Sequence, residues 1–189
     1  MSSTHRTVVL LVGLALGGCE RNPSSGITEP TLAPDEGLRY LDEIATPDVK
    51  QSVTGHYQFV GINTGNDFKY SLSAIRHDNG SVSGEFEERV ILASTGEFIR
   101  QTHGTVTCFE IVGNKARIGG LVEHATDPRF LPGTEFRLVV VDNGHGASDP
   151  PDLGSNARFG GKGSAKAFCD AGADFNLEPV QHGNIEVRP

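Results

Sequence analysis

From about Val53 onward, apolar and polar residues alternate along the chain. In the clearest run four apolar residues alternate with polar ones: Phe68, Tyr70, Leu72 and Ala74 alternate with Lys69, Ser71 and Ser73. Every second side chain of a strand points to the same face, so this pattern is typical of a β-strand with one buried and one wet face. The alternation therefore predicts an antiparallel β domain.

The turn Asp78-Asn79-Gly80 follows this run, and the flanking residues indicate how the hairpin pairs. A three-residue loop sets Leu72 opposite Phe86 and keeps one face of the hairpin apolar, whereas a two-residue loop sets Leu72 opposite a glutamate. We therefore expect the three-residue loop. Gly80 then takes the left-handed conformation, which costs little in the absence of a β-carbon.

A second hairpin is predicted by the Gly113-Asn114 turn between segments 105–112 and 115–122. A two-residue loop gives these cross-strand pairs: Phe109 with Ile118, Ile111 with Ala116, Val106 with Leu121, and Glu110 with Arg117. The last pair joins opposite charges, which favours the register. Gly119-Gly120 leaves room for a close backbone approach or a bend, as at a barrel corner.

Further strands are expected at 56–62, 97–102, 135–142, 165–170 and 185–188. Hairpins in succession with few helices predict an all-β fold, a single antiparallel β-barrel or β-sandwich of about eight strands. Small barrels either fill their interior with side chains or hold one small ligand. Filling is favoured by the large residues at predicted inward positions: Phe59, Phe68, Tyr70, Phe86, Phe109 and Phe136.

At the start of the chain, Leu16-Gly17-Gly18-Cys19 closes an apolar run that follows Arg6. A basic start, a short hydrophobic segment and small residues are the order of a secretory signal. The run is too short to cross about 30 Å of hydrocarbon. It resembles the bacterial lipoprotein signal, in which the cysteine is lipidated and becomes the first mature residue. We expect residues 1–18 to be this signal peptide and Cys19 the lipidation site, the alternative being an ordinary signal peptide with an incidental cysteine.

The same resemblance indicates where the protein lies. In Gram-negative lipoproteins an aspartate after the cysteine usually signals retention in the inner membrane, and this chain has Glu20 there. We therefore expect an exported protein anchored to the outer membrane of the cell envelope, facing the periplasm or the surface. Residues 19–52 are rich in proline and polar residues and predict a flexible tether, with a short helix at 35–45. The β domain is expected over 53–189.

Composition limits the classes of function. The chain has 24 acidic and 16 basic residues without a basic run, which argues against nucleic-acid binding. Once Cys19 is lipidated, Cys108 and Cys169 remain as an even pair in an oxidising compartment, so we expect a disulfide between them. Two separate buried thiols are the alternative.

The hairpin register also places His103 opposite His124, with β-carbons about 5 Å apart. Two imidazoles at this separation can reach one zinc or copper ion, with Asp127 or His145 as third ligand. The alternative is a pair of polar residues at the frayed end of a hairpin. Apart from this metal site, no cofactor is expected.

A long loop over 142–164 carries further polar side chains: Asp142, Asn143, His145, Asp149 and Asp152. Their oxygens suit calcium, yet the spacing matches no calcium loop, and a solvated loop is the simpler interpretation. Long loops in compact domains are often functional, so this loop is the first candidate for contact with a partner.

Turn residues along the chain carry a second resemblance: Val106-Thr107-Cys108, Gly113-Asn114, Gly119-Gly120, Asp142-Asn143-Gly144 and Gly183-Asn184-Ile185. The pattern resembles a group of secreted bacterial all-β proteins with no assigned activity, over most of residues 55–187. The resemblance implies an all-β fold and an exported setting, and it supplies no catalytic residues.

The sequence lacks a Gly-x-Ser-x-Gly elbow and a His-Glu-x-x-His helix, which disfavours an exported hydrolase. We therefore expect a binding or interaction module for an envelope protein or polymer. The alternative is a barrel that carries a small apolar ligand or a metal.

Overall fold

The computed structural model describes residues 49–145 and 148–189. Its elements in chain order are β1 (Val49–Val60), β2 (Asn66–His77), β3 (Val82–Leu92), β4 (Phe98–Val112), β5 (Lys115–Ala125), β6 (Glu135–Val141), β7 (Leu153–Ser155), β8 (Arg158–Gly160), α1 (Ser164–Ala171), β9 (Leu177–Pro179) and β10 (His182–Arg188). The predicted signal peptide, Cys19 and the helix at 35–45 lie outside the described residues. β1 begins a few residues before the expected start of the β domain.

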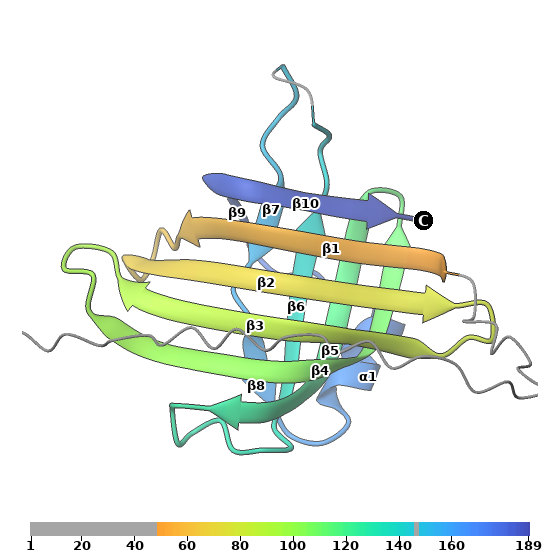
Figure 1. Cartoon of the computed structure of the whole chain (residues 1–189), viewed down its shortest axis with the longest axis horizontal. Coiled ribbons are helices and arrows are strands. Elements are labelled where there is room, and N and C mark those ends of the chain that lie inside the picture. Colours follow the sequence, from red (N-terminus) through yellow and green to blue (C-terminus); the bar gives the residue numbers. More distant parts are fainter. Residues whose placement is uncertain (1–48, 146–147) are drawn as a thin grey trace, which may run out of the picture. The chain divides into compact units, whose positions relative to one another are not determined.

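All ten strands belong to one antiparallel sheet in the order β10-β1-β2-β3-β4-β5-β6-β7-β9, with β8 paired to β6. The predicted antiparallel all-β fold is confirmed. In Figure 1, β1, β2 and β3 run across the front while β5 and β6 cross behind them, and the long strand β4 belongs to both layers. The sheet thus curls on itself into a half-barrel rather than dividing into two separate sheets.

The space inside this curl is filled. Phe86 of β3 stacks on Phe136 of β6 with ring centroids 4.1 Å apart, although these strands are not neighbours in the sheet. All six large residues predicted to face inward are buried. Since aromatic rings bury the largest apolar areas, these contacts across the interior stabilise the curl.

The β2–β3 hairpin pairs as predicted. Leu72 lies opposite Phe86, the His77 amide donates to the Ser81 carbonyl at 3.0 Å, and Gly80 has a φ of 81°. The three-residue loop and its left-handed glycine are therefore confirmed.

The β4–β5 hairpin pairs as predicted near its turn, where Phe109 lies opposite Ile118. The predicted pair Val106–Leu121 is wrong, because the register shifts at Thr107 and Val106 lies opposite Gly120. A bulge bends its strand, and here β4 passes from the front layer to the back. A β-carbon on Gly120 would lie 2.6 Å from the Phe136 ring, so the close approach of this ring needs glycine.

The segment predicted as a strand at 165–170 is instead the helix α1. Its buried residues Ala165, Phe168 and Cys169 are three and four residues apart, which places them on one helix face. This face packs on the outer side of β4, β5 and β6. The apolar pattern of so short a run fits both the period of a strand and that of a helix. The tertiary contacts of this segment favour the helix.

A buried ion pair joins the neighbouring strands β3 and β4. Glu88 is fully buried, and Arg100 donates to its two carboxylate oxygens at 2.8 and 3.1 Å. The Tyr70 hydroxyl donates to the same carboxylate at 3.1 Å. Burial, and then the Glu88 charge, raise the pKa of Tyr70 well above its ordinary value, so this hydroxyl keeps its proton and its role as donor.

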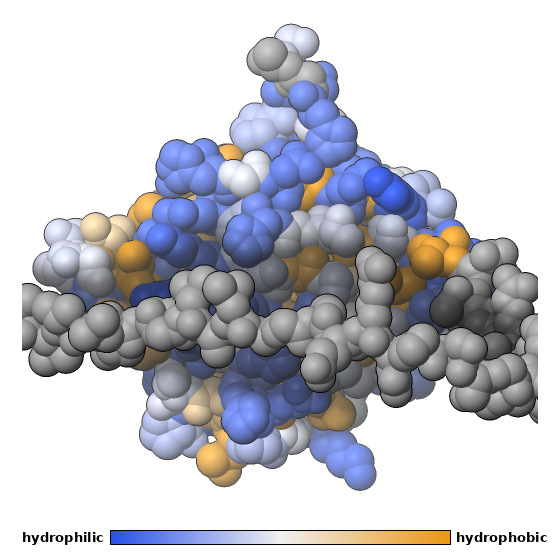
Figure 2. All heavy atoms as spheres, viewed as in Figure 1, coloured by the Kyte–Doolittle hydropathy of each residue, from blue (hydrophilic) through white to orange (hydrophobic). Residues whose placement is uncertain are grey.

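The face in Figure 2 is largely hydrophilic, with hydrophobic residues in small separate groups. Within 49–145 and 148–189, no helix combines the length and the apolar character needed to cross a membrane.

Candidate functional site

The loop that we expect to contact a partner also closes the free edge of β10. Asp152, the residue directly before β7, is almost fully buried. Its carboxylate accepts the Ile185 amide of β10 and the Asn143 amide of the loop, each at 2.8 Å. Asp142 likewise accepts the Val187 amide at 2.9 Å. These carboxylates take the place of a neighbouring strand on the free edge of β10.

The other residues of this loop also have close neighbours. The Asn143 side chain donates to the Pro151 carbonyl at 2.7 Å, and His145 Nδ1 lies 3.2 Å from Asn184 Oδ1. Asp149 is exposed and lies against Gly144, where a β-carbon would come 2.6 Å from its carboxylate. The predicted residues are therefore gathered in one region, where at least Asp142 and Asp152 have a structural role.

The two histidines face each other across β4 and β5 as predicted. A second bulge on β5, at Glu123, restores the register that the first bulge had shifted. His103 Nδ1 lies 3.5 Å from a Glu123 carboxylate oxygen, and the side chains of both residues reach solvent. The partly exposed pair is thus confirmed as neighbours in the sheet.

Neither expected third ligand joins the pair. Asp127 binds Arg129 at 2.6 Å, and the hydrogen bonds from this guanidinium lower the pKa of Asp127 to about 2. His145 instead has Asn184 as its neighbour. Among the described residues, no group of three or more His, Cys, Asp or Glu side chains is placed to hold a metal ion.

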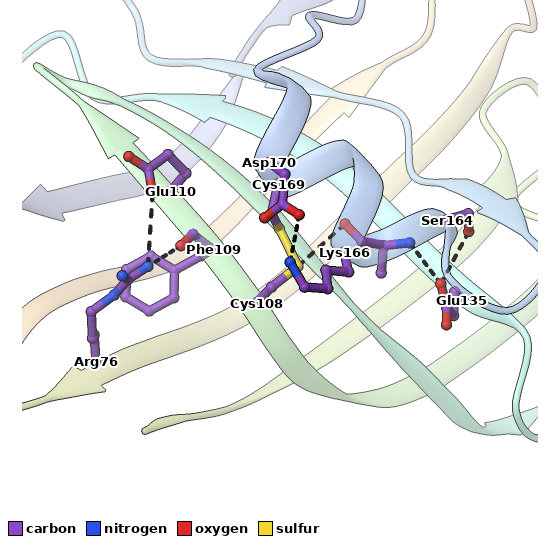
Figure 3. The surroundings of a disulfide bond; sticks show 10 residues. Arg76, Cys108, Phe109, Glu110, Glu135, Ser164, Lys166, Cys169 and Asp170 are labelled. Atoms are coloured by element: carbon purple, nitrogen blue, oxygen red, sulfur yellow. Dashed lines mark hydrogen bonds and ion pairs between the residues drawn. A yellow bond between two sulfur atoms is a disulfide. The ribbon is translucent and has the colours of Figure 1, made fainter. Parts of the chain in front are cut away.

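The predicted disulfide is confirmed. Cys108 of β4 and Cys169 of α1 are bonded, with Cα atoms 6.3 Å apart (Figure 3). The bond fastens α1 to the outer side of β4, next to Gly119, where a β-carbon would come 2.9 Å from Ala165 Cβ. The glycine noted in the sequence thus permits the close packing of this helix.

Glu135 caps the first turn of α1 from a strand far away in the sequence. Its carboxylate accepts the backbone amides of Gly163 at 2.8 Å and Ala165 at 2.6 Å, and the Ser164 hydroxyl at 3.3 Å (Figure 3 shows Ser164 beside it). Burial opposes ionisation of Glu135, but these hydrogen bonds outweigh it and hold the pKa of this carboxyl below its ordinary value. The ionised form therefore stabilises the start of α1.

A surface groove of about 580 Å³ lies beside the disulfide. The C-terminal half of β4 lines it together with Arg76 and Val82 of the β2–β3 hairpin and the last turn of α1. No local pattern in the sequence indicates this groove, because it exists only where β4, α1 and the hairpin meet. We take it as the candidate functional site.

Arg76 is tied to the wall of this groove. Its guanidinium donates to the Phe109 carbonyl, lies 4.9 Å above the Phe109 ring and 3.9 Å from a Glu110 carboxylate oxygen (Figure 3). The Nε atom of Arg76 is buried without a hydrogen-bond partner. Arg76 thus covers part of β4 with a cation held by three different kinds of contact.

The predicted ion pair between Glu110 and Arg117, the second arginine of the groove, is wrong. The two residues are cross-strand neighbours as expected, yet Arg117 donates to the Ala173 carbonyl at 2.9 Å and to Asp174 at 3.0 Å. The segment after α1 covers Arg117 and supplies both acceptors, so Glu110 is left beside Arg76 instead.

Chemically, the groove is suited to binding. The described residues that line it include two arginines, two carboxylates and the Thr107 hydroxyl, but no histidine that would act as a general base. Comparisons with protein families, with curated proteins and with solved structures find no match for this chain. The resemblance to secreted all-β proteins accordingly stays a prediction.

Proposed function

We propose that this chain is a lipid-anchored protein of the bacterial cell envelope whose β domain binds another envelope component on its surface. The observation that carries the proposal is the contrast between a filled interior and an open groove outside it. The rings of Phe86 and Phe136 occupy the centre of the half-barrel, whereas about 580 Å³ is open beside the disulfide. Ligand sites of proteins commonly have volumes of about 300–1,000 Å³.

The anchor rests on the sequence. Leu16-Gly17-Gly18-Cys19 resembles a lipoprotein signal, and acylation at Cys19 with more than one chain would hold the protein stably at a membrane. The Cys108–Cys169 disulfide supports an exported location, because disulfides persist in oxidising compartments. The proposed location is the outer membrane.

Labelling with radioactive palmitate tests the anchor. The full chain is expressed in a Gram-negative host, and label is expected in the wild type and in the control Gly17→Ala, which keeps a small residue before the cysteine. Cys19→Ser should carry no label and should leave the membrane fraction. Equal labelling of Cys19→Ser would refute lipidation at this residue.

Native mass spectrometry tests surface binding against carriage. We expect the purified protein to have the mass of the chain and its lipid alone, because buried aromatic side chains occupy the centre of the half-barrel. Photocrosslinkers placed in cells at Thr107 should capture an envelope component, whereas crosslinkers at Ser71, on the outer face of β2, serve as the control. A stoichiometric apolar adduct without crosslinking at Thr107 would favour the carrier instead.

A further inference from the structure

The C-terminal half of β4 has one edge without a paired strand. β4 pairs with β3 only as far as Thr105, whereas its pairing with β5 continues to Val112. At the Thr107 bulge β4 turns toward the back layer, while the first residues of β3 stay paired with β2. Within the described parts of the chain, no strand pairs with residues 106–112 on the β3 side.

Hydrogen-bonding groups of the backbone face this open edge. The Phe109 carbonyl lies there, since Arg76 reaches it from β2. The amide and carbonyl of one strand residue point to the same side, so the Phe109 amide also faces the open edge, as do those of Ile111 two residues later. The edge therefore offers two donors and two acceptors at the spacing of a strand. Arg76 already donates to one of these acceptors, the Phe109 carbonyl.

The groove follows the same residues. Its lining includes every residue from Thr107 to Glu110 and also Val112, which is 61% exposed. The disulfide holds the last turn of α1 as one wall, and Val82 belongs to the opposite side. An extended backbone placed along β4 would thus enter a space that already exists.

From these observations we propose that the open edge of β4, residues 106–112, takes up an extended peptide segment as an added antiparallel strand. This inference rests on the proposed function and names its partner class. Strand addition draws affinity from backbone hydrogen bonds and specificity from alternating side chains.

The side chains of β4 indicate the pattern of that peptide. Phe109 and Ile111 face the core, whereas Glu110 lies on the outer face, opposite Arg117 of β5. Because successive side chains of a strand alternate between faces, the added strand needs apolar residues on the inner side and polar residues on the outer side. A segment in which apolar and polar residues alternate fits both.

Hydrogen exchange on the full chain, purified in mild detergent, tests the inference. The probe is a short synthetic peptide of alternating valine and threonine, and the control peptide has an N-methyl group on every backbone amide, so that neither of its edges can pair. We expect the probe to slow exchange of the Phe109 and Ile111 amides by at least about tenfold, the effect of one hydrogen-bonded strand contact. The methylated peptide should leave the exchange of both amides unchanged, because its methyl groups keep its backbone from approaching β4 and remove the donors of the reciprocal hydrogen bonds.

Three variants refine the test. Arg76→Ala frees the Phe109 carbonyl, so the probe should bind about tenfold more tightly. Arg76→Lys keeps a cationic donor, and Arg89→Ala removes an arginine that lies 5.7 Å from the Phe98 ring at the far end of β4; both should bind the probe as the wild type does. Circular dichroism of each variant checks that it is folded.

Other outcomes overturn the inference. Equal protection by both peptides, or no protection at saturation, refutes strand addition at this edge. Protection that rises with protein concentration without peptide identifies a second copy as the occupant. If the peptide fails while crosslinkers at Thr107 still capture an envelope component, the proposed function stands and only this inference is wrong.

Discussion

Replacement of Asp152 by alanine tests whether the loop carboxylates close the sheet. Asp152 is 6% exposed, and its two oxygens accept two backbone amides at 2.8 Å each. A hydrogen bond to a charged group contributes about 1.5–3 kcal/mol, and a buried donor left unpaired adds a desolvation cost. We therefore expect Asp152→Ala to lower the free energy of unfolding by roughly 3 kcal/mol, a large part of the total stability of a domain.

Urea unfolding measures this loss. The chain has no tryptophan, so near-ultraviolet circular dichroism of Tyr57 and Tyr70, stacked with centroids 5.0 Å apart, reports the transition. The matched control is Asp170→Ala, which removes an exposed aspartate paired with Lys166 and should cost less than about 0.5 kcal/mol. Exchange of the Ile185 amide should accelerate only in Asp152→Ala.

A different result would contradict the structural role. If Asp152→Ala unfolds at the same urea concentration as the wild type, its carboxylate does not close the sheet. If calcium raises the Tm of the wild type but not that of Asp152→Ala, the loop is a cation site, as the sequence had left open.

Three further predictions concern the interior, the disulfide and α1. Arg100→Met should cost about 3 kcal/mol in urea unfolding, because it leaves the Glu88 charge buried and unpaired; adding Glu88→Gln should recover most of the loss, and additive losses would contradict a coupled pair. Replacing Cys108 and Cys169 by serine should cost roughly 3–4 kcal/mol, since the bond joins residues 61 apart; unchanged stability would show that it does not constrain the unfolded chain. Glu135→Gln should cost about 1 kcal/mol at neutral pH. The folded pKa of Glu135 is lowered, so its contribution is present above the ordinary value of 4.5 and is lost as the pH falls through the lowered value. The two proteins should therefore converge in stability at acid pH, and a pH-independent difference would refute the role of the charge.

The curled sheet explains why binding is proposed outside it. Its two layers are close enough for Phe86 and Phe136 to stack, so side chains occupy the space in which a wider barrel holds a ligand. The same curl bends β4 away from β3 at Thr107 and leaves the open edge. The bend of β4 thus brings the two layers into contact in the interior and also leaves the groove beside its open edge.

Arg76 also has a simpler role that fits the same contacts. Charged side chains on an exposed strand edge prevent unwanted pairing with other chains. Arg76 covers the Phe109 carbonyl and so protects an edge that would otherwise be fully open. The hydrogen bond from Arg76 to the Phe109 carbonyl would protect the edge against random pairing, and a matching peptide would displace the same bond. Arg76→Ala is therefore the informative variant.

The sequence alone determined the features that depend on residues close together in the chain or on the number of cysteines. The register of Leu72 with Phe86 follows from one turn and from the need to keep one face apolar, both of which are local. The opposition of His103 and His124 was also correct, although two bulges that the sequence did not indicate cancel between the turn and this pair. The disulfide followed from the expected compartment and an even number of remaining cysteines.

Only the tertiary structure decided the features that join distant segments. The run 165–170 is helical because Glu135 caps its first turn and Cys108 holds its buried face, and both lie in other strands. Asp152 closes the sheet because the fold brings Ile185 of the last strand beside it. The two residues are 33 positions apart, and no local pattern indicates their contact. The candidate site arises where β4 diverges from β3. Alternation and turns report which face each side chain takes, whereas the path of the whole sheet decides which distant groups meet and which edge stays open.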